Sequence, residues 1–268
     1  MADARMPERF YELARPLLPP EREPGPQGGR RPVDHYSVLK VIWFVLVTGC
    51  RWKDVPKEMG CCGETARTRL QAWERKGIWD QLHKQLLTML RHENELHLET
   101  AMIDSTQVRA FGGGEATGPS PVDRRKKGTK YTLLVDRNGV PLVIRLAPAN
   151  RSDQREILPT IVSFPAVGGK PGRPRTHPEK LYADAGYDCE ATRSILRWLG
   201  IEPHIRKRKT EHGSHLGRVR WFVERTISWI KGLRRMRVRY DRSGTTNDAW
   251  TTIAATVICL HILMNTNV

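Results

Sequence analysis

Three acidic residues stand at positions where a carboxylate is either costly to place or well placed for chemistry. Asp104 follows three apolar residues in a segment with the pattern of a strand, and aspartate is disfavoured in strands and costly to bury alone. Asp184 follows the apolar run Leu181–Ala183, and Glu224 lies in the middle of a long helical segment. Ligand groups gather at strand ends in open α/β sheets. Each residue also has an ordinary interpretation: a turn or cap for the aspartates, and a surface ion pair with Arg220 for Glu224.

Taken together, the three carboxylates form an oxygen donor set of the kind that Mg²⁺ prefers. Two such ions about 4 Å apart can activate a water or a 3′-hydroxyl and stabilise the leaving oxygen of a phosphodiester. We therefore interpret Asp104, Asp184 and Glu224 as catalytic and metal-binding residues, with two Mg²⁺ ions as cofactor and Mn²⁺ as a substitute. Arg220 and Lys231 lie four residues before and seven after Glu224. On a helix both side chains project in the same direction as Glu224, where they can bind DNA phosphates.

The charge of the chain points to a polyanionic partner. Its 268 residues include 45 Lys and Arg against 29 Asp and Glu, a formal net charge of +16. Nucleic acid is the first candidate, and an acidic membrane surface is a weaker one. The apolar run Ile253–Met264 is too short to span a bilayer. We expect a soluble, cytoplasmic protein that associates with the nucleoid when bound to DNA and has no membrane partner.

Residues 1–95 have the pattern of a helical DNA-binding domain. The expected helices are Glu8–Leu18, His35–Thr48, Trp52–Met59, Glu64–Arg75 and Ile78–Leu90. Helix, glycine-containing turn and helix form the helix-turn-helix pattern. The polar face of the helix from residue 64 to 75 carries the candidate DNA contacts Arg67, Thr68, Gln71 and Arg75. The alternative is that this face is simply the solvated side of a helical bundle.

Residues 98–268 change to alternating strands and helices. The expected strands are Thr100–Val108, Tyr131–Val135, Val140–Ala147, Lys180–Ala183 and Pro203–Ile205. The expected helices are 153–162, Cys189–Leu199, Leu216–Arg235 and Asp248–Met264. Asn138-Gly139 predicts a hairpin between the second and third strands. This order predicts an α/β fold, a mixed five-stranded sheet with helices on its faces, which is also the order of the ribonuclease H-like fold.

A long basic loop separates the first two expected strands. It is predicted over Arg109–Thr129 and is followed at once by Lys130. The cations assigned here to DNA phosphates are Arg124, Arg125, Lys126, Lys127 and Lys130. Phosphate contacts of this kind make DNA affinity fall steeply with salt.

Three segments resemble the catalytic motifs of DDE transposases, most closely the IS5 family of bacterial insertion sequences within the IS4-like class. They are Met102–Thr106, Leu181–Asp188 and Arg220-x3-Glu224-x6-Lys231. Further similar segments are Gly49–Pro56, Asn150–Asp153, Val223–Trp229 and Arg237–Tyr240. The resemblance implies a ribonuclease H-like core, Mg²⁺ dependence and a catalytic triad of Asp104, Asp184 and Glu224. The chain departs from the family signature at Gly217, where a tyrosine is usual.

The predicted function is a transposase that binds the terminal inverted repeats of an insertion sequence, cleaves its ends and joins the 3′-hydroxyl to target DNA. Because two ends meet one target, we expect a homodimer or larger assembly on double-stranded DNA. The stripe from Trp250 to Met264 is either a dimer surface or core. The alternative functions are a catalytically silent repressor derived from a transposase and a stand-alone structure-specific nuclease.

Overall fold

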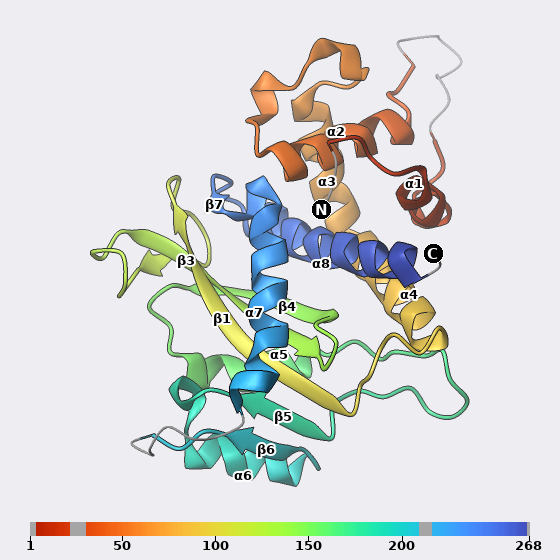
Figure 1. Cartoon of the computed structure of the whole chain (residues 1–268). Coiled ribbons are helices and arrows are strands. Elements are labelled where there is room, and N and C mark those ends of the chain that lie inside the picture. The colour runs from red at the N-terminus through yellow and green to blue at the C-terminus, as the bar shows by residue number, and fades with distance from the viewer. Residues whose placement is uncertain (1–3, 22–30, 209–215, 267–268) are drawn as a thin grey trace.

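A helical N-terminal part lies beside a twisted mixed sheet that has helices packed on it (Figure 1). The structure is a computed structural model that describes residues 4–21, 31–208 and 216–266. The N-terminal helices are α1 (Glu8–Ala14), α2 (His35–Thr48), α3 (Gly63–Arg75) and α4 (Ile78–His92). These agree with the expected helices in type and place, and α1 continues as a 3-10 turn, Arg15–Leu17.

The segment between α2 and α3 differs from its prediction. Two 3-10 turns, Trp52–Asp54 and Lys57–Met59, replace the helix expected over Trp52–Met59. Pro56 separates them, and proline lacks an N–H and pushes the residue before it towards extended backbone. Val55 accordingly has φ −64° and ψ 128°. The chain therefore has no short α-helix here to form a conventional helix-turn-helix with α3.

The sheet contains the five predicted strands and is mixed, as predicted. Its strands are β1 (Thr100–Ala110), β2 (Gly118–Pro119), β3 (Lys127–Asp136), β4 (Pro141–Pro148), β5 (Lys180–Ala183), β6 (Glu202–Ile205) and β7 (Val238–Arg239). The five long strands lie in the order β4-β3-β1-β5-β6, with β3 antiparallel to its neighbours and β1, β5 and β6 parallel. This is the ribonuclease H-like arrangement, to which β2 adds a short pairing with β3 and β7 a short pairing with the end of β1. The first strand is central.

The β3–β4 hairpin has a local explanation. The carboxylate of Asp136 accepts hydrogen bonds from the backbone N–H groups of Asn138 and Val140, each at 2.8 Å. Gly139 has φ +80°, and a Cβ there would lie 3.0 Å from the side chains of Arg225 and Thr226. The turn thus requires glycine both for its backbone conformation and for its contact with α7.

The long loop expected over Arg109–Thr129 is shorter than predicted. β1 continues to Ala110, β3 begins at Lys127, and β2 pairs with β3 between them. Arg239 helps to hold this segment in place, because its buried guanidinium donates to the Thr129 hydroxyl at 2.8 Å and to the Ala116 carbonyl at 3.3 Å. A contact from β7, more than 100 positions away, therefore anchors the loop.

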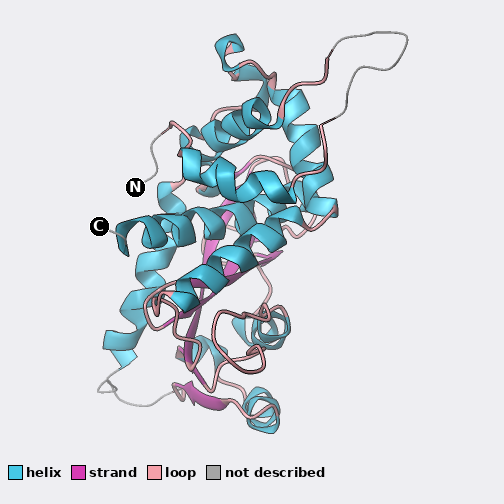
Figure 2. Cartoon of the chain, turned by 90° about the vertical axis from the view of Figure 1, so that its right-hand side faces the viewer, coloured by secondary structure: helices cyan, strands magenta, loops and turns pink. Residues whose placement is uncertain are grey.

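The remaining helices are α5 (Ile157–Val162), α6 (Glu190–Trp198), α7 (Leu216–Gly232) and α8 (Gly244–Thr266). α7 crosses β1 and also packs on β3 and β5, whereas α8 packs against α3, α4 and β4. Figure 2 shows the N-terminal helices and α8 stacked as one helical layer beside the sheet. The helical part and the sheet part therefore share a core through α8.

α8 settles one alternative left open by the sequence. By length and composition Gly244–Asn265 could cross a membrane, but 72% of its apolar window is buried inside the protein. Trp250, Ile253, Val257 and Leu260 are each at most 5% exposed, and only Met264 of the stripe reaches the surface. The stripe is core, so α8 does not offer it as a dimer surface.

Candidate active site

The two aspartates lie in register on neighbouring strands. β1 and β5 are parallel, and their last paired residues are Met102 and Tyr182. Asp104 and Asp184 each follow two positions later. Because side chains alternate along a strand and parallel neighbours are about 4.8 Å apart, both carboxylates fall on the same face of the sheet. The chain leaves β5 at Ala183, so Asp184 stands at the open strand end.

Glu224 reaches the same place from above the sheet. It lies on α7, which packs on β1 and β5. Arg220, one turn earlier on α7, joins the elements: its Nη2 is 3.7 Å from Asp104 Oδ2 and 3.3 Å from Glu224 Oε1. One guanidinium nitrogen thus lies between a carboxylate of the central strand and a carboxylate of the helix.

The electrostatics of Asp104 also indicate that the three acids converge. Burial raises the pKa of Asp104 to about 6, and the nearby carboxylates of Asp184 and Glu224 add to the increase. The backbone N–H of Ser105, which donates to Asp104 Oδ1 at 2.7 Å, and the Arg220 guanidinium act in the opposite direction. Like charges held near one another at partial burial disfavour each other's ionised form, and a bound cation would relieve that repulsion.

The donor chemistry suits a divalent ion, and the residues that would hold it are Asp104, Asp184 and Glu224. In the arrangement seen across residues 4–21, 31–208 and 216–266, no three acidic, histidine or cysteine side chains are close enough to enclose one. Arg220 instead supplies the positive charge between Asp104 and Glu224. When bound, divalent ions at such a site supply Lewis-acid stabilisation of phosphate oxygens.

The loop after Asp184 is held by its own aspartate and by a distant arginine. Asp184 Oδ1 accepts the backbone N–H of Gly186 at 2.8 Å. Arg208, beyond β6, donates from Nε to the Ala185 carbonyl at 3.1 Å. Local capping and one long-range contact therefore fix the direction of the Asp184 side chain.

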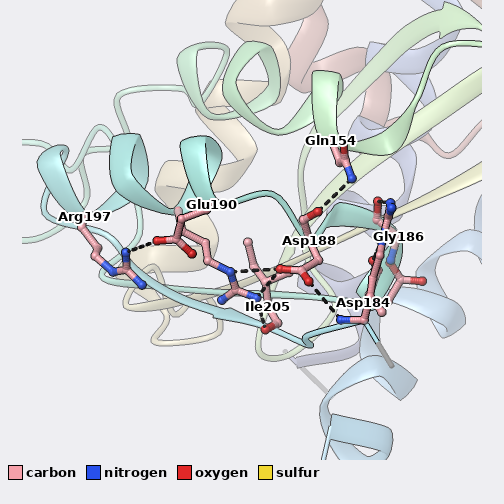
Figure 3. Close-up of polar contacts among 10 residues, drawn as sticks. Gln154, Asp184, Gly186, Asp188, Glu190, Arg197 and Ile205 are labelled. Carbon is pink, nitrogen blue, oxygen red and sulfur yellow. Dashed lines mark hydrogen bonds and ion pairs between the residues drawn. The ribbon is translucent and has the colours of Figure 1, made fainter. Parts of the chain in front are cut away.

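Asp188 ties this loop to two further elements (Figure 3). Its Oδ1 accepts from Arg193 of α6 at 2.7 Å, and that guanidinium also donates to the Ile205 carbonyl of β6 at 2.8 Å. Gln154 donates from Nε2 to the Asp188 backbone carbonyl at 2.8 Å. Hydrogen bonds to α6 and to Gln154 thus hold the segment from residue 181 to 188, which contains the candidate carboxylate Asp184.

Lys130 does not lie where a phosphate contact requires it. Its side chain is 4% exposed, and its Nζ donates to Asp153 Oδ1 and to the Arg151 carbonyl, each at 2.6 Å. Asp153 Oδ1 also accepts from the hydroxyl of Ser105, the neighbour of Asp104, at 2.8 Å. From the sequence, Asp153 is only the first residue of an expected helix and the last residue of a motif. That motif, taken together with a lysine inside an apolar strand, could have indicated this role.

Tyr187 is a second group that the sequence did not single out. Its side chain is 1% exposed. Burial raises the pKa of Tyr187 well above its usual value, and the carboxylates of Asp153, Asp104 and Asp184 raise it further, although a hydrogen bond with the Ser105 side chain acts to lower the pKa of the hydroxyl. The phenol is therefore protonated and lies among three aspartates.

The other predicted DNA contacts divide by exposure. Gln71 donates to the Thr246 hydroxyl at 2.7 Å, so it faces the start of α8 rather than solvent. Arg67 pairs with Glu64 on the surface, and Lys231 is partly buried. The exposed candidates are Thr68, Arg75, Arg124, Arg125, Lys126 and Lys127.

Comparison with protein families identifies the chain. Residues 97–260, which contain all three acidic residues, match the family "Transposase DDE domain", and residues 6–83 match "Putative transposase of IS4/5 family". The chain belongs to the DDE transposases. The protein described as "Putative transposase for insertion sequence element IS402" from Burkholderia cepacia is 44% identical over 151 residues, 56% of this chain and 72% of that protein. Its kinship places the chain in the IS5 family of insertion sequences.

Two further similarities accompany this assignment. A 16.2 kDa protein of insertion element IS402 from Burkholderia cepacia is 42% identical over 125 residues, 45% of this chain and 84% of that protein. The chain also aligns with a chain in the crystal structure of a pre-cleavage Mos1 transpososome. The alignment covers 89% of this transposase and 78% of the Mos1 chain, at 12% identity and a TM-score of 0.36. A similarity at that score carries no argument, so the ribonuclease H-like assignment rests on strand order and direction.

Proposed function

We propose that this transposase binds the terminal inverted repeats of an insertion sequence, cleaves phosphodiester bonds at its ends and joins the freed 3′-hydroxyl to target DNA. Asp104, Asp184 and Glu224 hold two Mg²⁺ ions for both steps, and Mn²⁺ can replace them. The substrate is double-stranded DNA, and the protein acts in the cytoplasm. The observation that carries the proposal is the register of Asp104 and Asp184 on adjacent parallel strands, with Glu224 joined to Asp104 through Arg220.

The charge of the described surface supports DNA as the substrate. The basic run Arg124–Lys127 is exposed beside β2, and Arg124 and Arg125 have positive φ values of 47° and 58°. The turn therefore presents consecutive cations outward at the end of the sheet. Thr68 and Arg75 on α3 remain exposed for contact with base edges, whereas Gln71 would first have to release Thr246.

The test is a cleavage and strand-joining assay with DNA that carries the element ends. Asp104→Asn and Asp184→Asn should abolish both reactions in Mg²⁺ while end binding stays equal or becomes tighter, because a charge that repels phosphate is removed. Asp54→Asn is the matched control, since Asp54 forms an exposed ion pair with Arg51. Cleavage by either catalytic variant at the parent rate would contradict the proposal.

The same assay separates the two alternatives. A silent repressor would bind the ends without cleaving them, and a stand-alone nuclease would cleave without joining. Because joining requires two active sites on one target, we also propose a homodimer or larger assembly on DNA. The mass of the joining-competent complex tests this, and one chain per complex would refute it.

A further inference from the structure

Asp153 brings a fourth carboxylate to the proposed metal site. A Cβ on Gly186 would lie 3.0 Å from Asp184 Oδ1 and 3.6 Å from Asp153 Oδ2. Both carboxylates therefore border the same glycine, on the turn that follows β5. The buried hydroxyl of Tyr187 lies among Asp153, Asp184 and Asp104 as well.

The two oxygens of Asp153 have different surroundings. Both hydrogen bonds that it accepts from described side chains go to Oδ1, from the Ser105 hydroxyl at 2.8 Å and from Lys130 Nζ at 2.6 Å. Lys130 is buried, so this half of the carboxylate is neutralised and fixed. Oδ2 is directed towards Gly186 and the side of Asp184. The side chain as a whole is 32% exposed.

Asp153 also belongs to an element that contacts both catalytic strands. The 3-10 turn Asp153–Glu156 bonds β1 through Ser105, the residue after Asp104. Its next residue, Gln154, bonds the Asp188 carbonyl on the loop that follows Asp184. A shift of this turn would therefore move the two catalytic aspartates relative to each other.

Resting on the function proposed above, we propose that Asp153 is a positioning residue that sets the affinity of the site for divalent cations. It places its second oxygen, Oδ2, on the side of Asp184 and holds the β1 segment of Asp104 through Ser105. Groups that orient metal-binding carboxylates are worth about 10- to 100-fold in metal affinity. The competing interpretation is that Asp153 serves only as counter-ion to the buried Lys130.

Variants that remove one or both charges of the Asp153–Lys130 pair distinguish these interpretations. Asp153→Asn removes the charge but leaves the Lys130 ammonium buried without a counter-ion, so it lowers stability under either interpretation. The double variant Asp153→Asn/Lys130→Met removes both buried charges. We expect its thermal midpoint to recover towards that of the parent, while its affinity for Mn²⁺ stays about 10-fold weaker or more.

The measurement is Mn²⁺ binding to the full chain without DNA, from the spectral signal of free Mn²⁺ in electron paramagnetic resonance. Parent-like Mn²⁺ affinity in the double variant overturns the proposal, because Asp153 would then only neutralise Lys130. Ser105→Ala offers a second, charge-neutral test, with an expected loss of roughly 3- to 10-fold in affinity. Unchanged affinity in Ser105→Ala overturns the positioning role in the same way.

Two controls separate this proposal from the function on which it rests. Asp54→Asn removes an exposed carboxylate from the turn between α2 and α3 and should leave Mn²⁺ affinity unchanged. Asp104→Asn should weaken Mn²⁺ binding at least as much as Asp153→Asn. If Asp104→Asn binds Mn²⁺ like the parent, the metal site itself is wrong; if only the Asp153 variants do, the triad stands and the fourth carboxylate does not.

Discussion

Removing the carboxylate of Asp241 should loosen the contact between the helical part and the sheet part. Asp241 accepts hydrogen bonds from Arg235 Nη2 at 2.6 Å, from Trp52 Nε1 at 3.2 Å and from Trp250 Nε1 at 3.1 Å. Arg235 also donates to the Cys50 carbonyl at 3.1 Å. One carboxylate thus joins the segment after α2 to the segment before α8.

The magnitude follows from burial. The side chains of Arg235 and Asp241 are 2% and 11% exposed. Loss of one partner of a buried ion pair costs about 3–5 kcal/mol, because the remaining charge is left without compensation. Each indole N–H left unpaired costs about 1–3 kcal/mol when it stays buried. These contributions share one acceptor and do not add, so we expect Asp241→Ala to lower the free energy of unfolding by about 3–5 kcal/mol.

Urea unfolding followed by tryptophan fluorescence measures this change. Trp52 and Trp250, two of the eight tryptophans, stack with ring centroids 5.4 Å apart, so the contact contributes to the signal. Asp54→Ala breaks an exposed ion pair and should cost about 0–1 kcal/mol. If Asp241→Ala is too unstable to purify, Asp241→Asn, which keeps an acceptor oxygen, gives a smaller loss of the same sign. A cost for Asp241→Ala equal to that of the Asp54 control would refute the reasoning.

Three further outcomes are expected. Burial and two neighbouring acidic side chains raise the pKa of Glu74 from 4.5 to about 8, so the free energy of unfolding should fall as pH rises from about 4.5 to 8. In thermal unfolding, Glu74→Gln should reduce this loss by about 2 kcal/mol across the range, once solvent screening is allowed for. The same pH dependence in parent and variant would contradict this prediction. Gly63→Ala places a Cβ 1.9 Å from the Trp52 carbonyl oxygen, whereas a Cβ on Gly77 meets nothing within 4 Å. Gly63→Ala should therefore lower the melting temperature more than Gly77→Ala, which costs about 1–2 kcal/mol for its positive φ. A larger loss for Gly77→Ala would contradict the close contact at Gly63. Replacing the exposed run Arg124–Lys127 with alanines should reduce the salt slope of DNA affinity by about 0.9 per lost phosphate contact, and an unchanged slope would remove the run from the interface.

Short-range signals explain what could be predicted. The Asn138-Gly139 turn predicted the β3–β4 hairpin, because the backbone conformation and the Asp136 cap lie within four residues. Alternation and turn positions were sufficient to predict the five strands in their order along the chain, and that order indicated the ribonuclease H-like class. The candidate triad came from acids in unusual local settings, and the register of β1 and β5 brings the two aspartates together.

Long-range contacts explain what could not. The prediction for Trp52–Met59 was wrong because Pro56 interrupts the segment, and the loop prediction failed because Arg239 orders a segment far from it in sequence. Lys130 has the composition of a phosphate contact. Its burial depends on Asp153, 23 positions later.

The sequence by itself determined the class of the chain, the order of its strands and helices along the chain and the three candidate acids, because propensity, turn chemistry and motif spacing act over a few residues. Only the tertiary structure decided which cations face solvent, that the α8 stripe is core, and that Arg220 lies between Asp104 and Glu224. These outcomes depend on which elements pack together. Burial and pairing are properties of that packing, and the residues that share a contact can be almost 200 positions apart, as Trp52 and Asp241 are.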